Sequence, residues 1–231
     1  MKPLPFKMRQ TTPMEKYRAE SFWTKEPETI AWIDAFDPSG VFFDVGSNIG
    51  VYALYCASMY STAKIHAFEP MPQNYDALYL NARKNCFDNI YAWPYPLGAE
   101  MQRDITLKMP EAGEEAGLSG AQLDYNGIWG EVVHVMCIDR LCGCKNGLPL
   151  PDYVKIDIDG QEIGVIRGMM TVLPTVKSML VEVSSKTRDE VLTILTFSGF
   201  TTLNRFNTMT PHSRERRAKE GIDAENIIFT R

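Results

Sequence analysis

The most informative part of this chain is VFFDVGSNIG, residues 41–50, with KIHAFEP following at residues 64–70. The first five residues are apolar except for Asp44, as expected of a strand that is covered on both faces. Gly46 permits a sharp turn and close approach of a ligand. Glu69 ends a second strand. Its separation from Asp44 along the chain is near the roughly 20 residues expected for an acid that accepts hydrogen bonds from a ribose. The two stretches therefore predict a nucleoside-binding strand–helix–strand unit.

The turn after the first strand distinguishes two classes of cofactor. Enzymes that bind dinucleotides carry G-x-G-x-x-G, because a helix N-terminus must meet a pyrophosphate there. Here the turn is GSNIG, with Asn48 where the second glycine would be and Gly50 suited to close packing of the next helix on the strand. S-adenosylmethionine has a ribose and an amino-acid end but no phosphate, so it fits this turn, and Asp44 suits its amine. A dehydrogenase and a turn without ligand are the alternatives.

Composition narrows the class of protein. The chain has 231 residues, of which 45% are hydrophobic and 23% charged, as in an ordinary soluble domain. Its net charge of −5 argues against a nucleic-acid-binding surface. No apolar run is long enough for a transmembrane helix, and residues 1–7 lack the apolar segment of a secretory signal. We therefore expect a cytoplasmic protein without nucleic-acid or membrane partners.

The chain contains five cysteines, and an odd number without a signal peptide indicates reduced thiols. Three of them gather near a histidine, in a group made of His134, Cys137, Cys142 and Cys144. Neither spacing is the C-x₂-C of a zinc ribbon, so ordinary thiols are favoured over a zinc site.

Strands and helices alternate along the rest of the chain. Residues 1–22 predict an irregular N-terminal arm, and a helix capped by Thr24 is expected to run to Phe36. Strands are expected at 41–45, 64–68, 89–95, 153–158, 178–183, 200–204 and 226–229, and helices at 49–60, 74–85 (capped by Asn74), 161–173 and 187–198. This alternation predicts a mostly parallel seven-stranded sheet with helices on both faces, in a single domain over residues 23–231.

One segment breaks this rhythm, at about residues 99–137. Ile105 and Val133 lie in short alternating stretches, and the residues between them are rich in glycine and acid. The pattern predicts a β-hairpin or extended loop in place of a crossover helix. Because the preceding strand ends on the cofactor side, we expect residues 99–135 to contribute to the acceptor pocket, with the glycine-rich centre as a lid.

Four blocks of sequence together resemble the FkbM-type S-adenosylmethionine-dependent methyltransferases. They are FDVGSNIG (43–50), FEP (68–70), VKIDIDGQE (154–162) and LVEV (180–183). The resemblance runs from about Thr24 to Phe229, although the family usually has Glu where this chain has Asp159. It implies a Rossmann-like class I methyltransferase fold and O-methylation of sugars or natural products. It also implies that the methionine end of S-adenosylmethionine is held by Asp44, Gly46, Ser47, Asn48 and Gly50, the ribose by Glu69, and that Met71 lies beside the adenine.

Asp157 is the predicted catalytic residue. A hydroxyl is a poor nucleophile until a base takes its proton, and the apolar setting of Asp157 at a strand end is expected to raise its pKa. Lys155 and Asp159 complete the predicted catalytic set, and Glu182 lies nearby as a candidate for substrate binding. A purely structural carboxylate, or a divalent cation held by these acids as in catechol-type methyltransferases, is the alternative. No full ligand set is visible, so no metal is predicted.

The remaining substrate candidates are His134, in the insertion, and Arg214. Arg214 belongs to a basic run with His212, Arg216, Arg217 and Lys219. Such a run is usually a solvated face, but residues 200–204, if parallel to the sheet, would deliver it to the cofactor side, where it suits an anionic substrate. His66, within a strand, is expected in the core.

The sequence therefore predicts an S-adenosylmethionine-dependent O-methyltransferase that acts on a small-molecule or glycan hydroxyl. A nucleic-acid base methyltransferase is disfavoured, because DIDG stands at residues 157–160 in place of a Pro-Pro-aromatic turn. A non-catalytic module that binds S-adenosylmethionine is the alternative from a different class.

Overall fold

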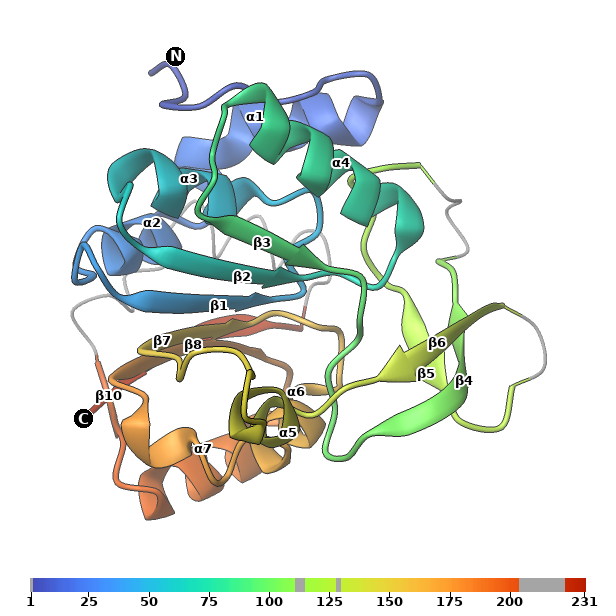
Figure 1. The fold of residues 1–231 in the computed structure, drawn as a ribbon, viewed down its shortest axis with the longest axis vertical. Coiled ribbons are helices and arrows are strands. Elements are labelled where there is room, and N and C mark those ends of the chain that lie inside the picture. Colours follow the sequence, from blue (N-terminus) through green and yellow to red (C-terminus); the bar gives the residue numbers. More distant parts are fainter. Residues whose placement is uncertain (1, 111–114, 128–129, 204–222) are drawn as a thin grey trace.

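The computed structural model describes residues 2–110, 115–127, 130–203 and 223–231. Its main sheet has the strand order β3-β2-β1-β7-β8-β10-β9 (Figure 1). The bounds are β1 Val41–Val45, β2 Lys64–Phe68, β3 Ile90–Trp93, β7 Tyr153–Ile156, β8 Ser178–Val183, β9 Thr201–Thr202 and β10 Glu225–Thr230. All neighbours pair in parallel except β10, which is antiparallel to β8 and β9. The mostly parallel seven-stranded sheet predicted from the sequence is confirmed.

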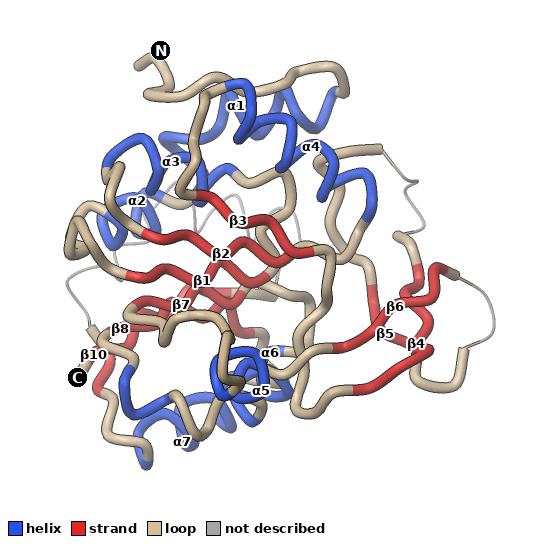
Figure 2. Tube along the Cα trace, in the orientation of Figure 1, coloured by secondary structure: helices blue, strands red, loops and turns tan. Residues whose placement is uncertain are grey.

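Helices cover both faces of this sheet (Figures 1 and 2). One face carries α1 Pro13–Lys25, α2 Pro27–Ile33, α3 Val51–Met59 and α4 Pro72–Lys84, and the other carries α5 Ile138–Gly143, α6 Glu162–Arg167 and α7 Arg188–Phe197. Successive side chains of a strand point to opposite faces, so Phe42 belongs to the core beneath α2 and α3 and Phe43 to the core against α6 and α7. Both rings are fully buried.

The N-terminal segment departs most from prediction. Residues 13–22, expected to be irregular, form most of α1, and Thr24 lies inside that helix instead of capping another. A capping box explains where the helix starts: the Thr12 hydroxyl accepts from the Glu15 backbone N–H, and the Glu15 carboxylate accepts from the Thr12 N–H. The same carboxylate forms an ion pair with Arg9 at 2.6 Å.

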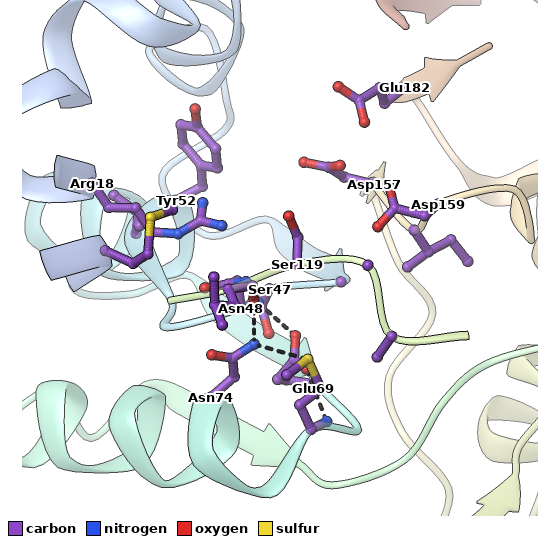
Figure 3. A pocket seen from close by; sticks show the side chains of 18 of the residues that line it. Arg18, Ser47, Asn48, Tyr52, Glu69, Asn74, Ser119, Asp157, Asp159 and Glu182 are labelled. Carbon is purple, nitrogen blue, oxygen red and sulfur yellow. Dashed lines mark hydrogen bonds between the residues drawn. The ribbon is translucent and has the colours of Figure 1, made fainter. Parts of the chain in front are cut away.

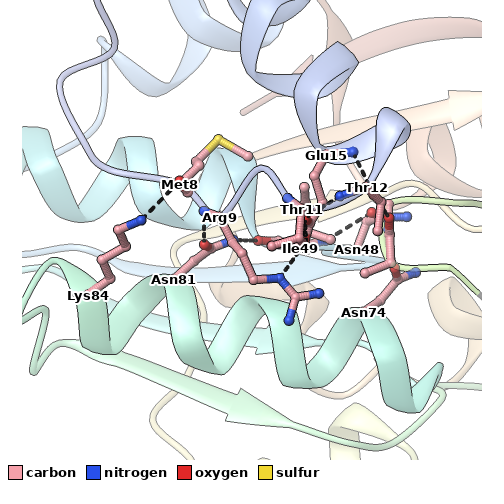
Figure 4. A network of polar contacts seen from close by, with 12 residues as sticks. Met8, Arg9, Thr11, Thr12, Glu15, Asn48, Ile49, Asn74, Asn81 and Lys84 are labelled. Atoms are coloured by element: carbon pink, nitrogen blue, oxygen red, sulfur yellow. Dashed lines mark hydrogen bonds and ion pairs between the residues drawn. The ribbon is translucent and has the colours of Figure 1, made fainter.

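Polar contacts attach the segment before α1 to α4 (Figure 4). The Arg9 backbone N–H donates to Asn81 Oδ1 at 2.7 Å, and Lys84 Nζ donates to the Met8 carbonyl at 3.4 Å. Asn81 Nδ2 donates in turn to the Ile49 carbonyl, in the turn after β1, at 3.1 Å. These bonds hold the start of α1 close to that turn.

The insertion forms its own three-stranded antiparallel sheet, in the order β5-β4-β6. Its strands are β4 Gln102–Lys108, β5 Gln122–Asp124 and β6 Glu131–Val135, and Figure 1 shows them to one side of the main sheet. The predicted β-structure in place of a crossover helix is confirmed, with β5 as an additional strand.

Two predicted helix ends are wrong. The helix α4 begins at Pro72, so Asn74 lies in its first turn instead of at its cap. The helix α6 ends at Arg167, before the expected stop at Pro174, with Gly168 as its C-cap. A Cβ at Gly168 would lie 2.0 Å from the Gly98 carbonyl oxygen, so the backbones meet too closely there for any other residue. Among the helices described, none has the length and apolar character needed to cross a membrane.

Candidate active site

A cavity of about 420 Å³ opens at the carboxyl ends of β1, β2, β7 and β8 (Figure 3). This is the edge at which open α/β sheets bind their ligands. The predicted site residues that line it are Gly46, Ser47, Asn48, Glu69, Met71, Lys155, Asp157, Asp159 and Glu182. The sequence therefore identified three of the strand ends that meet around one cavity, and the structure brings their polar side chains together.

Other predicted residues lie elsewhere. Asp44 is buried behind the turn, with 1% of its surface exposed, and neither it nor Gly50 lines the cavity. His134 is exposed on β6 and also lies outside the cavity lining. Arg214, with the rest of its basic run, falls outside the described residues. His66 is buried in β2, where Trp93 Nε1 donates to its Nδ1 at 3.1 Å, as expected of a core histidine.

Both glycines of the turn have close neighbours that leave no room for a Cβ. Gly46 has φ +79°, and a Cβ there would lie 2.0 Å from the Asp157 carbonyl oxygen at the end of β7. Gly50 has φ +85°, and its Cβ would lie 2.3 Å from Cδ1 of Leu78 on α4. The tight contact of Gly50 is therefore with α4, not with the strand as expected. Asn48 also adopts positive φ, at 51°, which asparagine tolerates better than most residues.

Glu69 is held with its carboxylate in place. Oε2 accepts from the Asn48 backbone N–H at 2.8 Å, and Oε1 accepts from the Met71 N–H at 2.9 Å. Burial raises the pKa of this carboxyl to about 7, although these bonds act in the opposite direction. The Asn74 side chain also donates to this carboxylate. A carboxylate has about four lone-pair sites, so at least one remains for a ribose hydroxyl.

Lys155 is the centre of a buried charge cluster. Its side chain is 1% exposed, and Nζ donates to Asp157 Oδ2 at 2.5 Å. Burial acts to lower its pKa, but the carboxylates of Asp157, Asp44 and Glu26 outweigh burial and hold the pKa above its usual value. The raised pKa favours the ammonium form of Lys155, which holds Asp157 in place and attracts the carboxyl of Asp44.

The acids Asp157 and Asp159 sit in contrasting surroundings. Burial acts to raise the pKa of Asp157, but Lys155 outweighs it, so the pKa is lowered. The expectation of a raised pKa for Asp157 is wrong, because its partner is a buried cation. Asp159 lies at the exposed mouth of the cavity, where partial desolvation and then repulsion from Asp157 raise its pKa. Divergent pKa values in one site are typical of groups with different chemical roles.

Sequence reasoning missed the wall that α1 contributes. The residues concerned are Met14, Tyr17, Arg18, Ser21, Phe22 and Lys25. A signal for this helix was present in Thr12-Pro13-Met14-Glu15, which has the capping-box spacing with proline at the first helical position.

A loop of the insertion closes another side of the cavity, through residues 118–121. The Leu118 carbonyl accepts from Asn48 Nδ2 at 2.6 Å and from Asn74 Nδ2 at 2.9 Å. The Gly117 N–H donates to Asn74 Oδ1 at 2.7 Å, and the Gly117 carbonyl accepts from Arg18 Nε at 2.6 Å. The insertion therefore reaches the turn after β1, as expected of a segment that shapes the pocket.

The cysteines near His134 make separate contacts. Cys137, Cys142 and Cys144 each place their sulfur near a different backbone carbonyl, those of Gly168, Pro149 and Arg140. In the part of the chain that the structure describes, no group of three or more histidine, cysteine, aspartate or glutamate side chains is arranged to hold a metal ion.

The sheet order and the site at its carboxyl edge define a Rossmann-like methyltransferase fold. The family described as the methyltransferase FkbM domain matches residues 44–202, and the chain belongs to this family. The match begins after α1 and α2, so these helices lie outside the matched region.

Individual relatives are more distant. The chain is 28% identical over 151 residues to the hexuronic acid methyltransferase AglP of Haloferax volcanii, covering 65% of this chain and 59% of that protein. It is 26% identical to the 31-O-demethyl-FK506 methyltransferase FkbM of Streptomyces tacrolimicus, covering 71% of this chain and 74% of that protein. The crystal structure of methyltransferase FkbM from Methylobacillus flagellatus KT superimposes with a TM-score of 0.54 at 16% identity, over 85% of this chain and 44% of that one. The first relative is therefore considerably longer than the matched region.

Proposed function

We propose that the protein is an S-adenosylmethionine-dependent O-methyltransferase that acts on a hydroxyl of a sugar, glycan or natural-product acceptor. The observation that carries this proposal is that Glu69, the turn at 46–48 and Asp157 open onto one cavity. The relatives named above, whose substrates are a hexuronic acid and a natural product, support an acceptor of this class.

The residues present fit this cofactor. Glu69 would accept from the ribose hydroxyls, and the backbone of the turn at 46–48 would lie along the methionine part. A smaller cavity of about 50 Å³ shares Gly46 and Pro70 with the large one and is mainly apolar, being lined by Phe68, Leu97 and Leu123 among others. The smaller cavity cannot hold a whole adenine ring, so its apolar walls would contact only part of the ring. When bound, the cofactor supplies a methyl group on a good leaving group, so the chain must mainly align the acceptor.

The two acids at the end of β7 have different proposed roles. Asp157, kept ionised by Lys155, positions the acceptor by accepting a hydrogen bond from a hydroxyl next to the reacting one. Asp159, whose pKa is raised, takes the hydroxyl proton as the bond to carbon forms and passes it to solvent at the cavity mouth. Glu182 points toward the same space and would contact the acceptor (Figure 3).

Transfer of labelled methyl from S-adenosylmethionine to a panel of sugars and glycosides tests the proposal. Asp157→Asn and Asp159→Asn should each lower the rate by about 10²–10⁴ while binding of S-adenosylhomocysteine is retained. Asp88→Asn, an exposed position outside the cavity, is the matched control and should leave the rate unchanged. If the wild-type protein binds the cofactor product but transfers no methyl to any acceptor, the alternative of a non-catalytic binding module is favoured.

A further inference from the structure

Arg18 stands at the centre of the α1 wall and extends into the cavity (Figure 3). Its Nε donates to the Gly117 carbonyl at 2.6 Å, and this bond fixes the plane of the guanidinium. The bond uses one of five N–H donors, and the two terminal nitrogens remain available on the cavity side.

The other cations that line the cavity are already paired. Lys155 Nζ lies 2.5 Å from Asp157, and Lys25 Nζ lies 2.8 Å from Glu26. Arg18 forms no ion pair within 4.0 Å among the described residues, although the acids of Glu69 and Asp159 act on it from further away. Arg18 is therefore the cation of this cavity that is best placed to meet a ligand.

We propose that Arg18 binds a carboxylate of the bound ligand. This inference rests on the proposed function. A guanidinium presents parallel N–H donors that match the two oxygens of a carboxylate, whereas an ammonium acts as a point charge. The pre-oriented plane reduces the conformational entropy lost when the ligand binds. Two ligands of the reaction can supply this group: the amino-acid end of the cofactor, and an acceptor that carries an acid, such as a uronic acid.

The acids of the cavity do not oppose this assignment. Glu69 would be engaged by the ribose, and Asp157 is paired with Lys155. The other two acids of the lining, Asp159 and Glu182, lie across the cavity from Arg18 (Figure 3). A ligand carboxylate beside Arg18 would therefore have the guanidinium as its nearest charge. Loss of a hydrogen-bonded contact between charged groups should weaken binding roughly ten- to hundredfold.

Two cofactor-like ligands distinguish the first source. S-adenosylhomocysteine has the amino-acid end, whereas 5′-methylthioadenosine has the same nucleoside and thioether without it. If the carboxylate is the cofactor's, calorimetry should show that Arg18→Gln weakens binding of S-adenosylhomocysteine roughly ten- to hundredfold and leaves binding of 5′-methylthioadenosine unchanged. Arg18→Lys should have an intermediate effect. Arg83→Gln, an exposed position on α4 with the same charge change, should affect neither ligand.

The second source is tested on protein saturated with S-adenosylhomocysteine. If the carboxylate belongs to the acceptor, Arg18→Gln leaves the affinity for both nucleosides unchanged. The same variant then loses the preference of the wild type for binding glucuronate over glucose. Either result supports the inference.

Equal weakening of both nucleosides would show that Arg18 only holds the Gly117 loop, and it would overturn the inference. So would unchanged binding of both nucleosides together with unchanged discrimination between glucuronate and glucose. Wild-type protein that binds neither nucleoside would contradict the proposed function itself. Melting temperatures show whether each variant is folded. If Arg18→Gln is not folded, Arg18→Lys is used in its place, because the lysine keeps a hydrogen-bond donor at this position.

Discussion

Lys155→Met removes the cation at the centre of the buried charge cluster. The side chain is replaced by one of similar length, so packing is largely retained and the charge is lost. Asp157, Asp44 and Glu26, all of which interact with the Lys155 ammonium, then lack their shared counter-charge. Breaking a buried pair by removing one partner costs about 3–5 kcal/mol. Since small domains have a free energy of unfolding of about 5–15 kcal/mol, the variant should lose a large part of its stability.

Lys108→Met is the matched control. Lys108 and Asp124 also lie 2.5 Å apart, but the lysine side chain is 57% exposed, against 1% for Lys155. The same substitution at the same distance should therefore leave the free energy of unfolding nearly unchanged, because water compensates an exposed charge.

Urea denaturation at two pH values measures both effects. Asp157 has a lowered folded-state pKa in the wild type, so its stabilisation is present above its unfolded pKa and is lost as pH falls. Without Lys155, burial acts unopposed on the carboxyls of Asp157 and Asp44 and raises their pKa values, so the variant is least stable at a pH where these groups must be ionised. The difference between wild type and Lys155→Met should therefore be larger at pH 8 than at pH 4.5. Equal losses for the Lys155 and Lys108 variants, or a difference independent of pH, would refute the role given to this cluster.

Three further predictions concern the cavity and its frame. Burial raises the folded-state pKa of Glu69 to about 7, so the stabilisation from this carboxyl is present at low pH and lost as pH rises. Glu69→Gln cannot titrate, so its free energy of unfolding relative to wild type should increase from pH 5 to 8, as measured by urea denaturation. Asn74→Ala leaves the Gly117 N–H without its 2.7 Å acceptor and should cost about 1–3 kcal/mol in thermal unfolding; a loss below 0.5 kcal/mol, about the size of an ordinary surface effect, would contradict this. Gly50→Ala places a Cβ at positive φ and against Leu78, so chemical denaturation should show a loss of at least about 1–2 kcal/mol.

Much of the sheet could be predicted from the sequence. Residues 41–45, 64–68 and 178–183 coincide with β1, β2 and β8, because apolar runs bounded by turn residues leave little freedom of assignment. The positions of Glu69 and of the turn at 46–50 followed from the same pattern, since both are tied to strand ends.

The α1 wall could not be recognised from its hydrophobic pattern. Its buried positions are Glu15, Ala19 and Phe22, so a charged residue occupies one place in the apolar stripe and a small residue another. The burial of Glu15 depends on bonds from Arg9 and Thr11, which only the folded chain supplies.

The lowered pKa of Asp157 was partly accessible. Residues two apart on a strand point to the same face, so Lys155 and Asp157 were neighbours by rule. What the sequence did not show is that Lys155 is fully buried and that β1 places Asp44 directly opposite it in the sheet register. These two facts make the ammonium dominate the effect of burial on the pKa of Asp157.

The chemical form of the transferred methyl group distinguishes a hydroxyl acceptor from a carboxylate acceptor. Methyl-labelled S-adenosylmethionine is incubated with the protein and with glycosides that offer both hydroxyl and carboxylate groups, and the product is treated with alkali. We expect label in an alkali-stable ether, formed by the wild type and reduced about 10²–10⁴-fold in Asp157→Asn. Label released by alkali would show an ester, and it would contradict a hydroxyl acceptor. Label transferred equally by wild type and Asp157→Asn would contradict the site.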